Sequence, residues 1–186
     1  MDLTGSLDVQ VLNALFALRD QSAVQILIWI TELGSTITIG GLAVCAALLF
    51  AIRGRLTYLA GIIVSIAGSI VAVFLLKEIV HRARPPIDFQ AYPETDFSFP
   101  SGHATMSLAL YGFLAYVAWH TIPSKTLRIA AVLGLGVLIA AISFSRLYLG
   151  VHYLSDVAGG LIIGSFFVSL AIFTSERLWN EYVTFR

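Results

Sequence analysis

A histidine and an aspartate stand four residues apart in the sequence, at His152 and Asp156. On a helix this spacing places one side chain above the other. A carboxylate that accepts a hydrogen bond from one imidazole nitrogen fixes the tautomer and leaves the other nitrogen free to attack. Arg146 precedes this pair, and its planar guanidinium suits the oxygens of a phosphate. The alternative is an interfacial ion pair between Arg146 and Asp156 with a bystander histidine, which a His–Asp pair beside an apolar segment makes less attractive.

A second cluster, Pro100-Ser101-Gly102-His103, stands at the start of a long apolar stretch. Ser101 is placed to cap a helix, whose first N–H groups and dipole would then form an anion site. Gly102 allows a ligand to approach the backbone closely, and His103 titrates near neutral pH. Taken alone, this cluster favours an ordinary capped helix with an interfacial histidine.

A third cluster contains Lys77 and Arg84, seven residues apart and followed by Pro85 and Pro86. Seven residues make about two helical turns, so both cations point from one face of a helix, which the prolines should end. Two cations at the mouth of an apolar bundle are costly unless they bind an anion. Interfacial anchoring by these long basic side chains is the alternative.

The three clusters together hold the groups that phosphoryl transfer requires. These are positive charge around the phosphoryl oxygens, an in-line nucleophile and an acid behind the leaving oxygen. The chain has no HExxH sequence and no cluster of carboxylates, so we expect neither a metal ion nor another cofactor at the site.

The composition indicates that these residues stand in a membrane. Of the 186 residues, 58% are hydrophobic and only 12% are charged, and the mean hydropathy is +0.88, whereas a soluble domain carries about twice that share of charge. The net charge of zero speaks against a nucleic-acid partner. The single cysteine, Cys45, excludes a disulfide within the chain and is expected to be a small buried residue.

The chain is expected to form one all-α domain, an integral membrane bundle of about five transmembrane helices. Five stretches free of Asp, Glu, Lys and Arg are apolar enough to cross a bilayer core of about 30 Å: 35–52, 56–76, 104–122, 129–144 and 157–174. We expect residues 1–34 to form two amphipathic helices at the interface before a transmembrane region over 35–186. The alternative for 1–34 is one tilted span with a charged centre at Arg19 and Asp20. The N-terminus lacks a basic region followed by an apolar core, so no cleaved signal peptide is expected.

Alternating spans place the loops 77–103 and 145–156 on one face of the membrane, so that all three clusters converge there. Six basic residues fall on the opposite face: Arg53, Arg55, Lys125, Arg128, Arg177 and Arg186. Five fall on the face of the clusters: Arg19, Lys77, Arg82, Arg84 and Arg146. The excess of basic residues is cytoplasmic in membrane proteins, which predicts an extracytoplasmic site in a cell (inner) membrane.

Other polar residues are given no part in the site. His81 and Arg82 fall on other faces of the helix that carries Lys77, and we expect them to contact headgroups or solvent. His120 is expected at the far interface. The segment 87–99 mixes aromatic and acidic residues and is interpreted as an interfacial loop beside the site, with a lid or a headgroup-reading role as the alternative.

The three clusters resemble the signature motifs of the type 2 phosphatidic acid phosphatases, a superfamily that includes vanadium haloperoxidases and glucose-6-phosphatase. The resemblance covers most of the chain from about residue 35. It implies that His152 is a nucleophile that forms a phosphohistidine, that Asp156 orients it, and that His103 protonates the leaving oxygen. It also implies that five residues hold the phosphate: Lys77, Arg84, Ser101, Gly102 and Arg146.

The leading hypothesis is a metal-independent membrane lipid phosphatase. Its substrate would present a terminal phosphate at the interface, as undecaprenyl diphosphate, phosphatidylglycerophosphate and phosphatidic acid do. The first alternative is a lipid phosphotransferase that uses the same site with an acceptor other than water. The second alternative is a non-catalytic bundle that binds or transports anions. A soluble haloperoxidase is disfavoured, because the apolar stretches place the site at a bilayer.

Overall fold

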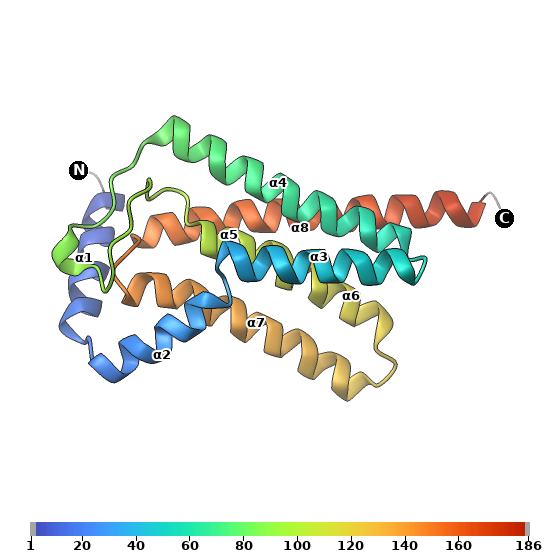
Figure 1. The fold of residues 1–186 in the computed structure, drawn as a ribbon, viewed down its shortest axis with the longest axis horizontal. Helices are drawn as coiled ribbons and strands as arrows, with labels where there is room; N and C mark the ends of the chain where they lie inside the picture. The colour runs from blue at the N-terminus through green and yellow to red at the C-terminus, as the bar shows by residue number, and fades with distance from the viewer. Residues whose placement is uncertain (1–2, 185–186) are drawn as a thin grey trace.

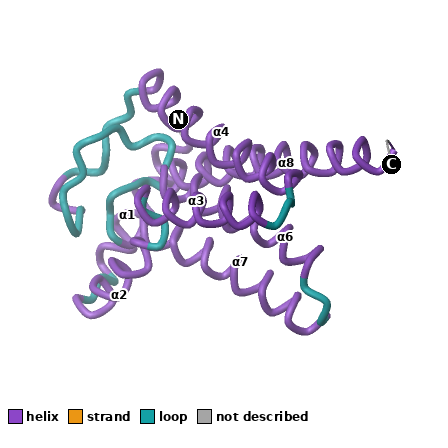
Figure 2. Tube along the Cα trace, turned by 45° about the vertical axis from the view of Figure 1, so that its right-hand side comes forward, coloured by secondary structure: helices purple, strands orange, loops and turns teal. Residues whose placement is uncertain are grey.

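The computed structural model describes residues 3–184, with side chains for residue 5 and residues 7–179, and all of its regular elements in that range are helices (Figure 1). In chain order they are α1 (Leu3–Ala17), α2 (Gln21–Glu32), α3 (Thr36–Ile52), α4 (Leu56–Val80), η1 (Ile87–Phe89), α5 (Gly102–Ser107), η2 (Leu108–Gly112), α6 (Phe113–Thr121), α7 (Lys125–Tyr148) and α8 (Leu154–Thr184). The long helices run along one axis, and α1 lies across one end of them. Figure 2 shows the long loop between α4 and α5 at that same end.

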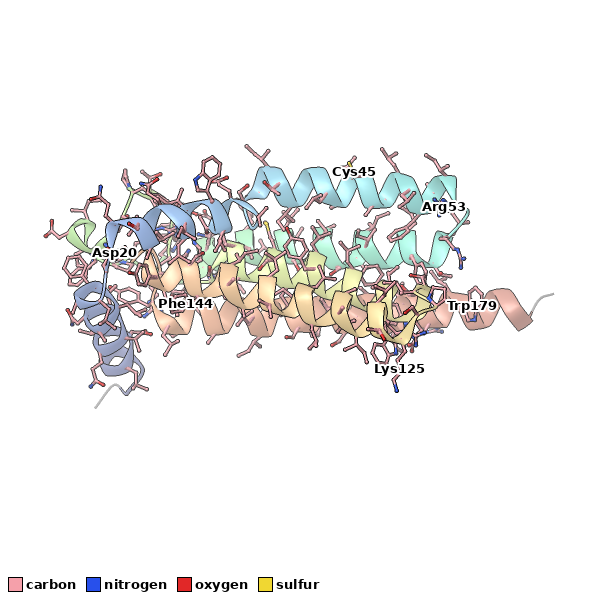
Figure 3. The ribbon with its side chains drawn as sticks, turned by 90° about the horizontal axis from the view of Figure 1, so that it is seen from below. Asp20, Cys45, Arg53, Lys125, Phe144 and Trp179 are labelled. Atoms are coloured by element: carbon pink, nitrogen blue, oxygen red, sulfur yellow. The ribbon has the colours of Figure 1, made fainter. Side chains whose placement is uncertain are left out.

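Four helices are long and apolar enough to cross a membrane: Gln21–Ile52, Leu56–Val80, Lys125–Tyr148 and Leu154–Trp179. Their outward faces carry large apolar side chains, and Ile37 and Ile52 are 88% and 83% exposed. Such a surface is stable in lipid, where helices also satisfy their own backbone hydrogen bonds. The chain is therefore an integral membrane protein with an all-helical bundle, as predicted. Cys45 belongs to this outer surface of α3 and is exposed, so the expectation that it is buried was wrong (Figure 3).

The described part of residues 1–34 forms two helices, α1 and α2. α1 lies across the end of the bundle, whereas α2 continues through a short turn into α3, so that Gln21–Ile52 forms one apolar stretch of 32 residues. The Asp20 carboxylate begins α2 by accepting a hydrogen bond from the Ala23 amide at 3.0 Å. Arg19 and Asp20 therefore lie in the turn before α2. The alternative for residues 1–34, one continuous span with these two charges at its centre, does not form.

The stretch expected to span over 104–122 consists of three consecutive helical elements, α5, η2 and α6, in the middle of the bundle. Ala109, Leu110 and Phe113 on these elements are fully buried. η2 is a π-helical turn, and such turns leave backbone groups to be satisfied from outside the helix. The Ser65 hydroxyl of α4 donates a hydrogen bond to the Ala109 carbonyl at 2.8 Å. Because the segment is divided, none of its elements is by itself long enough to cross a membrane.

Close packing between α5 and α8 joins the cluster at 100–103 to the one that contains His152 and Asp156. A Cβ added to Gly160 would lie 2.7 Å from the Ser101 carbonyl oxygen, and one added to Gly164 would lie 2.8 Å from that of Thr105. The two glycines therefore allow a helix approach that side chains would prevent. The Ser101 amide donates to the Asp156 carbonyl at 3.1 Å, so the first turn of α8 is held against the start of α5.

The two ends of the bundle differ in the residues they carry. Figure 3 places Asp20 at one end and Arg53, Lys125 and Trp179 at the other. The loop after α4 and the loop before α8 meet at the Asp20 end, where the Ala91 amide donates to the Leu149 carbonyl at 2.9 Å. The expected convergence of these two loops at one end is therefore confirmed.

Candidate active site

A cavity of about 310 Å³ lies where the two loops meet the ends of α4, α5 and α7. Six of the eight expected site residues line it: Lys77, Arg84, Gly102, His103, Arg146 and His152. The other two, Ser101 and Asp156, are fully buried beside lining residues. Folding thus brings together residues from three clusters that are widely separated in the sequence.

The two nitrogens of the His152 ring have different surroundings. Nδ1 lies 3.5 Å from Asp156 Oδ2, across one turn of chain at the start of α8. Nε2 lies 3.2 Å from Arg84 Nη1 on the cavity side. A carboxylate on one side of the ring and a cationic cavity on the other is the arrangement that a nucleophilic imidazole needs. The Nδ1–Oδ2 separation is long for a hydrogen bond, as catalytic contacts often are before substrate binds.

Asp156 is anchored by several donors besides His152. Its Oδ2 accepts from the Ser98 hydroxyl at 2.5 Å and from the Tyr153 amide at 2.8 Å, which caps the first turn of α8. The Ser98 hydroxyl also lies 3.4 Å from His152 Nδ1. Burial of such a carboxylate is tolerated because its oxygens are hydrogen-bonded.

The imidazole of His152 is almost completely buried, with 2% of its side chain exposed. This burial lowers the pKa of His152 to about 4, although the hydrogen bond with Asp156 acts in the opposite direction. The positive charges of Arg146 and Arg84 lower it further. The ring is therefore neutral at physiological pH, and a neutral ring has the lone pair that attack requires.

Three cations surround the cavity, and each is held in place by the protein. Arg84 lies beyond the end of α4 at Val80, so the prediction that it shares a helix face with Lys77 was wrong. It donates to the Val151 carbonyl at 2.8 Å, which ties the loop after α4 to the loop that carries His152. Arg146 is buried, with 1% exposed, and donates to the Thr31 hydroxyl at 3.0 Å and the Tyr92 hydroxyl at 2.5 Å. Its Nε has no partner among the described residues. Fixed, partly unsatisfied donors of this kind suit an anion.

Two carboxylates from the loop 87–99 contact these cations, which the sequence did not predict. Asp96 accepts from Lys77 at 2.6 Å and also pairs with Arg84. Glu94 accepts from Arg146 at 2.7 Å. Burial alone would raise the pKa of Asp96, but the hydrogen bonds from Lys77 and Arg84 outweigh it and hold the pKa at about 2. The loop therefore lies within the site and not merely beside it.

Ser101 does not have the capping role that the sequence predicted. It precedes α5, but its side chain makes no capping hydrogen bond. Its hydroxyl is buried and has no partner among the described residues. A buried hydroxyl without a partner costs free energy, and the two residues that follow it, Gly102 and His103, line the cavity.

Arg82 was expected to contact headgroups or solvent, and the structure contradicts this. Its Nη1 donates to Asp156 Oδ1 at 2.5 Å, and its Nη2 donates to Asp8 Oδ2 at 2.6 Å. The pKa of Arg82 is raised: burial would lower it, but the hydrogen bond to Asp8 and the charge of Asp156 prevail. No sequence motif marks Asp8, which is 74 residues from Arg82.

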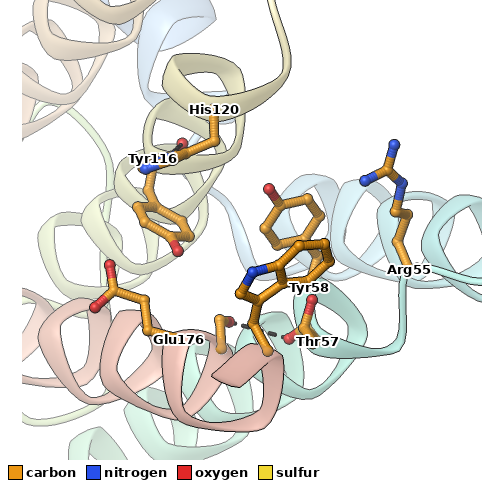
Figure 4. Close-up of a pocket in the computed structure, with 8 residues that line it drawn as sticks. Arg55, Thr57, Tyr58, Tyr116, His120 and Glu176 are labelled. Atoms are coloured by element: carbon orange, nitrogen blue, oxygen red, sulfur yellow. Dashed lines mark hydrogen bonds between the residues drawn. The ribbon is translucent and has the colours of Figure 1, made fainter. Parts of the chain in front are cut away.

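The other histidines lie outside the site. His81 follows the last residue of α4 and stacks edge-on against Phe97, with its ring centroid 4.4 Å away. His120 lines a larger cavity of about 510 Å³ at the opposite end of the bundle, between α4, α6 and α8 (Figure 4). That cavity contains none of the eight expected residues. Volume alone therefore does not identify the site here, and the convergent charged groups do.

The described part of the chain contains no group of three or more His, Cys, Asp or Glu residues that could hold a metal ion. The three cations and the unpartnered donors supply positive charge and hydrogen bonds at the same place. The donor set of the cavity thus fits an anionic group better than a cation.

Comparison with known proteins agrees with this chemistry. Residues 58–179 match the sequence model of the PAP2 superfamily. Phosphatidylglycerophosphatase B of Bacillus subtilis is 39% identical over 93 residues, which make up 48% of this chain and 44% of that protein. A decaprenylphosphoryl-5-phosphoribose phosphatase of Mycobacterium tuberculosis is 33% identical over 105 residues, or 53% and 52% of the two chains. The chain thus spans about half the length of these curated relatives.

A crystal structure shares the fold over almost the whole chain. It is that of a transmembrane PAP2 type phosphatidylglycerolphosphate phosphatase from Bacillus subtilis, with a TM-score of 0.83 and 27% sequence identity. The match covers 95% of this chain and 88% of the other. All eight expected site residues fall within the stretch 58–179 that matches the superfamily.

Proposed function

The chain belongs to the PAP2 superfamily, as its three motifs indicated, and from this membership we propose that it removes the terminal phosphate of a membrane lipid. The orientation of His152 carries the proposal: Asp156 faces one ring nitrogen, and the other lies beside Arg84 at the cavity. A bundle that only binds or transports anions would need the cations. It would not need an imidazole oriented by a buried carboxylate.

In the first step, His152 Nε2 attacks the terminal phosphorus of the substrate. The N–P bond forms as the bond from phosphorus to the leaving oxygen breaks, and His103 gives that oxygen a proton. Five phosphate-binding groups stabilise the charge on the non-bridging oxygens: Lys77, Arg84, Ser101, the Gly102 amide and Arg146. Asp156 stabilises the positive charge that develops on the ring of His152.

In the second step, water attacks the phosphorus of the phosphohistidine. His103, now deprotonated, accepts a proton from the water as the new P–O bond forms and the N–P bond breaks. Inorganic phosphate leaves, and His152 returns to its neutral form. No step requires a metal ion, because protein cations supply the positive charge.

The position of the cavity supports an amphiphilic substrate. It lies at the end of an apolar bundle, where the headgroup of a lipid can reach it while the chains stay beside the helices. The two relatives named above are, by their names, phosphatases of phosphatidylglycerophosphate and of decaprenylphosphoryl-5-phosphoribose. We therefore propose a terminal phosphate or diphosphate on a glycerolipid or polyprenol, with undecaprenyl diphosphate, phosphatidylglycerophosphate and phosphatidic acid as candidates.

We assign the fifth crossing to the continuous helical segment formed by α5, η2 and α6. With α2–α3, α4, α7 and α8 it brings both site loops to one face. The opposite end carries basic residues at Arg53, Arg55, Lys125, Arg128 and Arg177; Arg186, counted with them, lies outside the described residues. The positive-inside rule then places the active site on the extracytoplasmic face of a bacterial inner membrane.

Phosphate release from the three candidate lipids, measured with purified protein and chelator present, tests the proposal. The H152A variant should release no phosphate from any of them and should form no phosphohistidine. The matched control is H120A, which alters the histidine at the opposite end and should keep the wild-type rate. Full release by H152A would refute the mechanism, and loss of activity on chelation would refute metal independence.

Transfer to an acceptor other than water is a second possibility with the same first step. Product analysis with added lipid or sugar alcohols distinguishes the two reactions. A hydrolase yields inorganic phosphate in the same amount whether the alcohol is present or absent, whereas a transferase yields a new phosphate ester.

A further inference from the structure

The N-terminal helix α1 contributes a buried acid to the rear of the active site. Asp8 is 2% exposed although α1 lies across the end of the bundle. Its two oxygens accept three hydrogen bonds, from the Ser155 amide at 2.8 Å, the Ser155 hydroxyl at 2.6 Å and Arg82 at 2.6 Å. A carboxylate is rarely buried unless it is paired and hydrogen-bonded. Asp8 therefore attaches α1 to the first turn of α8, where Asp156 lies.

Arg82 connects Asp8 to the catalytic pair. One branch of its guanidinium donates to Asp8 and the other to Asp156 and the Ser155 hydroxyl, at 2.5 and 2.6 Å. The Arg82 Cζ atom lies 4.6 Å from the centre of the Tyr153 ring, a cation–π contact that also holds the guanidinium. A planar fork can bridge two carboxylates in one geometry only, so the position of Arg82 is set by both.

The two oxygens of Asp156 are divided between partners as a result. Oδ1 is taken by Arg82. Oδ2 is left to Ser98, to the Tyr153 amide and to His152. Rotation of the carboxylate would break the contact with Arg82, so the oxygen that faces the imidazole stays in place. Neither Asp8 nor Arg82 lines the cavity, so neither contacts the phosphate.

We propose that Asp8 and Arg82 are positioning residues: the chain Asp8–Arg82–Asp156 fixes the carboxylate that orients His152, and α1 is thereby part of the catalytic unit. The inference rests on the proposed function, since it assumes that His152 is the nucleophile. It assigns a role to a helix outside the stretch 58–179 that matches the superfamily. Asp8 and Asp156 share the single positive charge of Arg82, so Asp8 also reduces the extent to which Arg82 neutralises Asp156.

This arrangement predicts opposite effects of two substitutions on the proton affinity of His152. R82Q removes a positive charge from Asp156, so protonated His152 becomes more favourable and its pKa should rise. D8N leaves Arg82 to neutralise Asp156 alone, so the pKa should fall. The charged or titratable groups that face His152 are Asp156 from α8, Arg84 after α4, Arg146 of α7 and His103 of α5, and neither variant changes them.

The first measurement is the titration of His152 by NMR of the histidine-labelled protein in nanodiscs. The chain has only four histidines, and H152Q identifies the signal. This measurement needs no turnover, so it remains informative even if the proposed reaction is wrong. A pKa that moves in the same direction in R82Q and D8N, or in neither variant, overturns the proposal.

The second measurement is steady-state kinetics with whichever candidate lipid the wild-type protein hydrolyses. Partners that orient a reacting group from outside the site are each worth about 10- to 100-fold when removed, by analogy with metal sites. We expect kcat to fall by about that factor in both variants, with KM nearly unchanged. D20N is the matched control, because Asp20 is also an N-terminal acid but only caps α2; it should keep the wild-type kcat. Wild-type kcat in folded D8N would refute the role of α1.

Thermal unfolding of each variant separates a loss of positioning from a loss of fold. If R82Q does not fold, R82K replaces it, and the titration must then show a His152 pKa that falls in D8N and moves less in R82K. One ammonium group retains the charge but cannot bridge two carboxylates as a fork does. R82K should therefore lower kcat while moving the pKa of His152 less than D8N does, and a wild-type kcat in R82K contradicts the proposal.

Discussion

Asp96 occupies the cations that a substrate phosphate would use, and neutralising it should strengthen anion binding. Its carboxylate pairs with both Lys77 and Arg84. A phosphate that takes these two cations must first displace Asp96 from them. D96N keeps the size of the side chain but removes its charge, so the competing interaction is weakened without opening space.

The size of the effect follows from the pKa of Asp96. It is held at about 2, against 3.8 for an unperturbed aspartate. This difference corresponds to about 2.4 kcal/mol of interaction with the cations, at about 1.36 kcal/mol for each pH unit. The side chain is 56% exposed, and solvent screening of an exposed pair reduces the figure to about 1 kcal/mol. A change of about 1 kcal/mol strengthens phosphate binding by about fivefold.

The assay is product inhibition of lipid hydrolysis by inorganic phosphate at pH 7, in nanodiscs. The inhibition constant should be about fivefold lower in D96N than in the wild-type protein. D88N is the matched control, because Asp88 lies in the same loop but is exposed and does not line the cavity. An inhibition constant that is unchanged or higher in D96N would show that Asp96 does not compete with phosphate.

Three further predictions concern His152, the packing of α5 against α8 at Gly160, and Arg146. Because the pKa of His152 is lower in the folded state, at about 4, than in the unfolded state, at about 6.5, the unfolded state binds the proton first as the pH falls. The folded state therefore loses stability between about pH 6.5 and about pH 4. Thermal unfolding of H152Q should depend less on pH between 7 and 4.5 than that of the wild-type protein. G160A should lower the free energy of unfolding by about 1–3 kcal/mol, because the added methyl group meets the Ser101 carbonyl, whereas G136A, with open space around it, should not. R146K loses charged hydrogen bonds of about 1.5–3 kcal/mol each, so phosphate inhibition should weaken about tenfold or more, and unchanged inhibition would exclude Arg146 from the phosphate site.

Six of the eight expected site residues line one cavity, and part of the reason is local geometry. His152 and Asp156 lie one turn apart, so short-range geometry already orients that pair, whereas Arg84 lies beyond the end of α4 at Val80 and does not share a helix face with Lys77 as predicted. The cavity brings the two clusters together, as the alternation of apolar spans required. The role of Ser101 as a helix cap was wrong, because the fold leaves its hydroxyl buried and unpartnered instead.

The sequence failed where a charged residue is paired across a long separation. In the sequence, Arg82 resembles a long basic side chain that reaches the membrane interface, and only the docking of α1 makes it a partly buried bridge between two buried carboxylates. Asp96 and Glu94 read as ordinary acids of an interfacial loop until the loop folds onto the cations. α2 was assigned to the interface because Arg19 and Asp20 interrupt the apolar pattern, but both charges fall in the turn that precedes it.

Composition and motif spacing by themselves determined that this chain is a helical membrane bundle of the PAP2 superfamily. The reason is that lipid permits few backbone solutions and that His152 and Asp156 are set within one turn. Only the tertiary structure decided which acids and bases complete that site. The pairing of Arg82 with the buried Asp8, and the approach of Asp96 to Lys77, depend on the docking of α1 and of a loop onto residues far apart in the chain, and no local pattern encodes those distances.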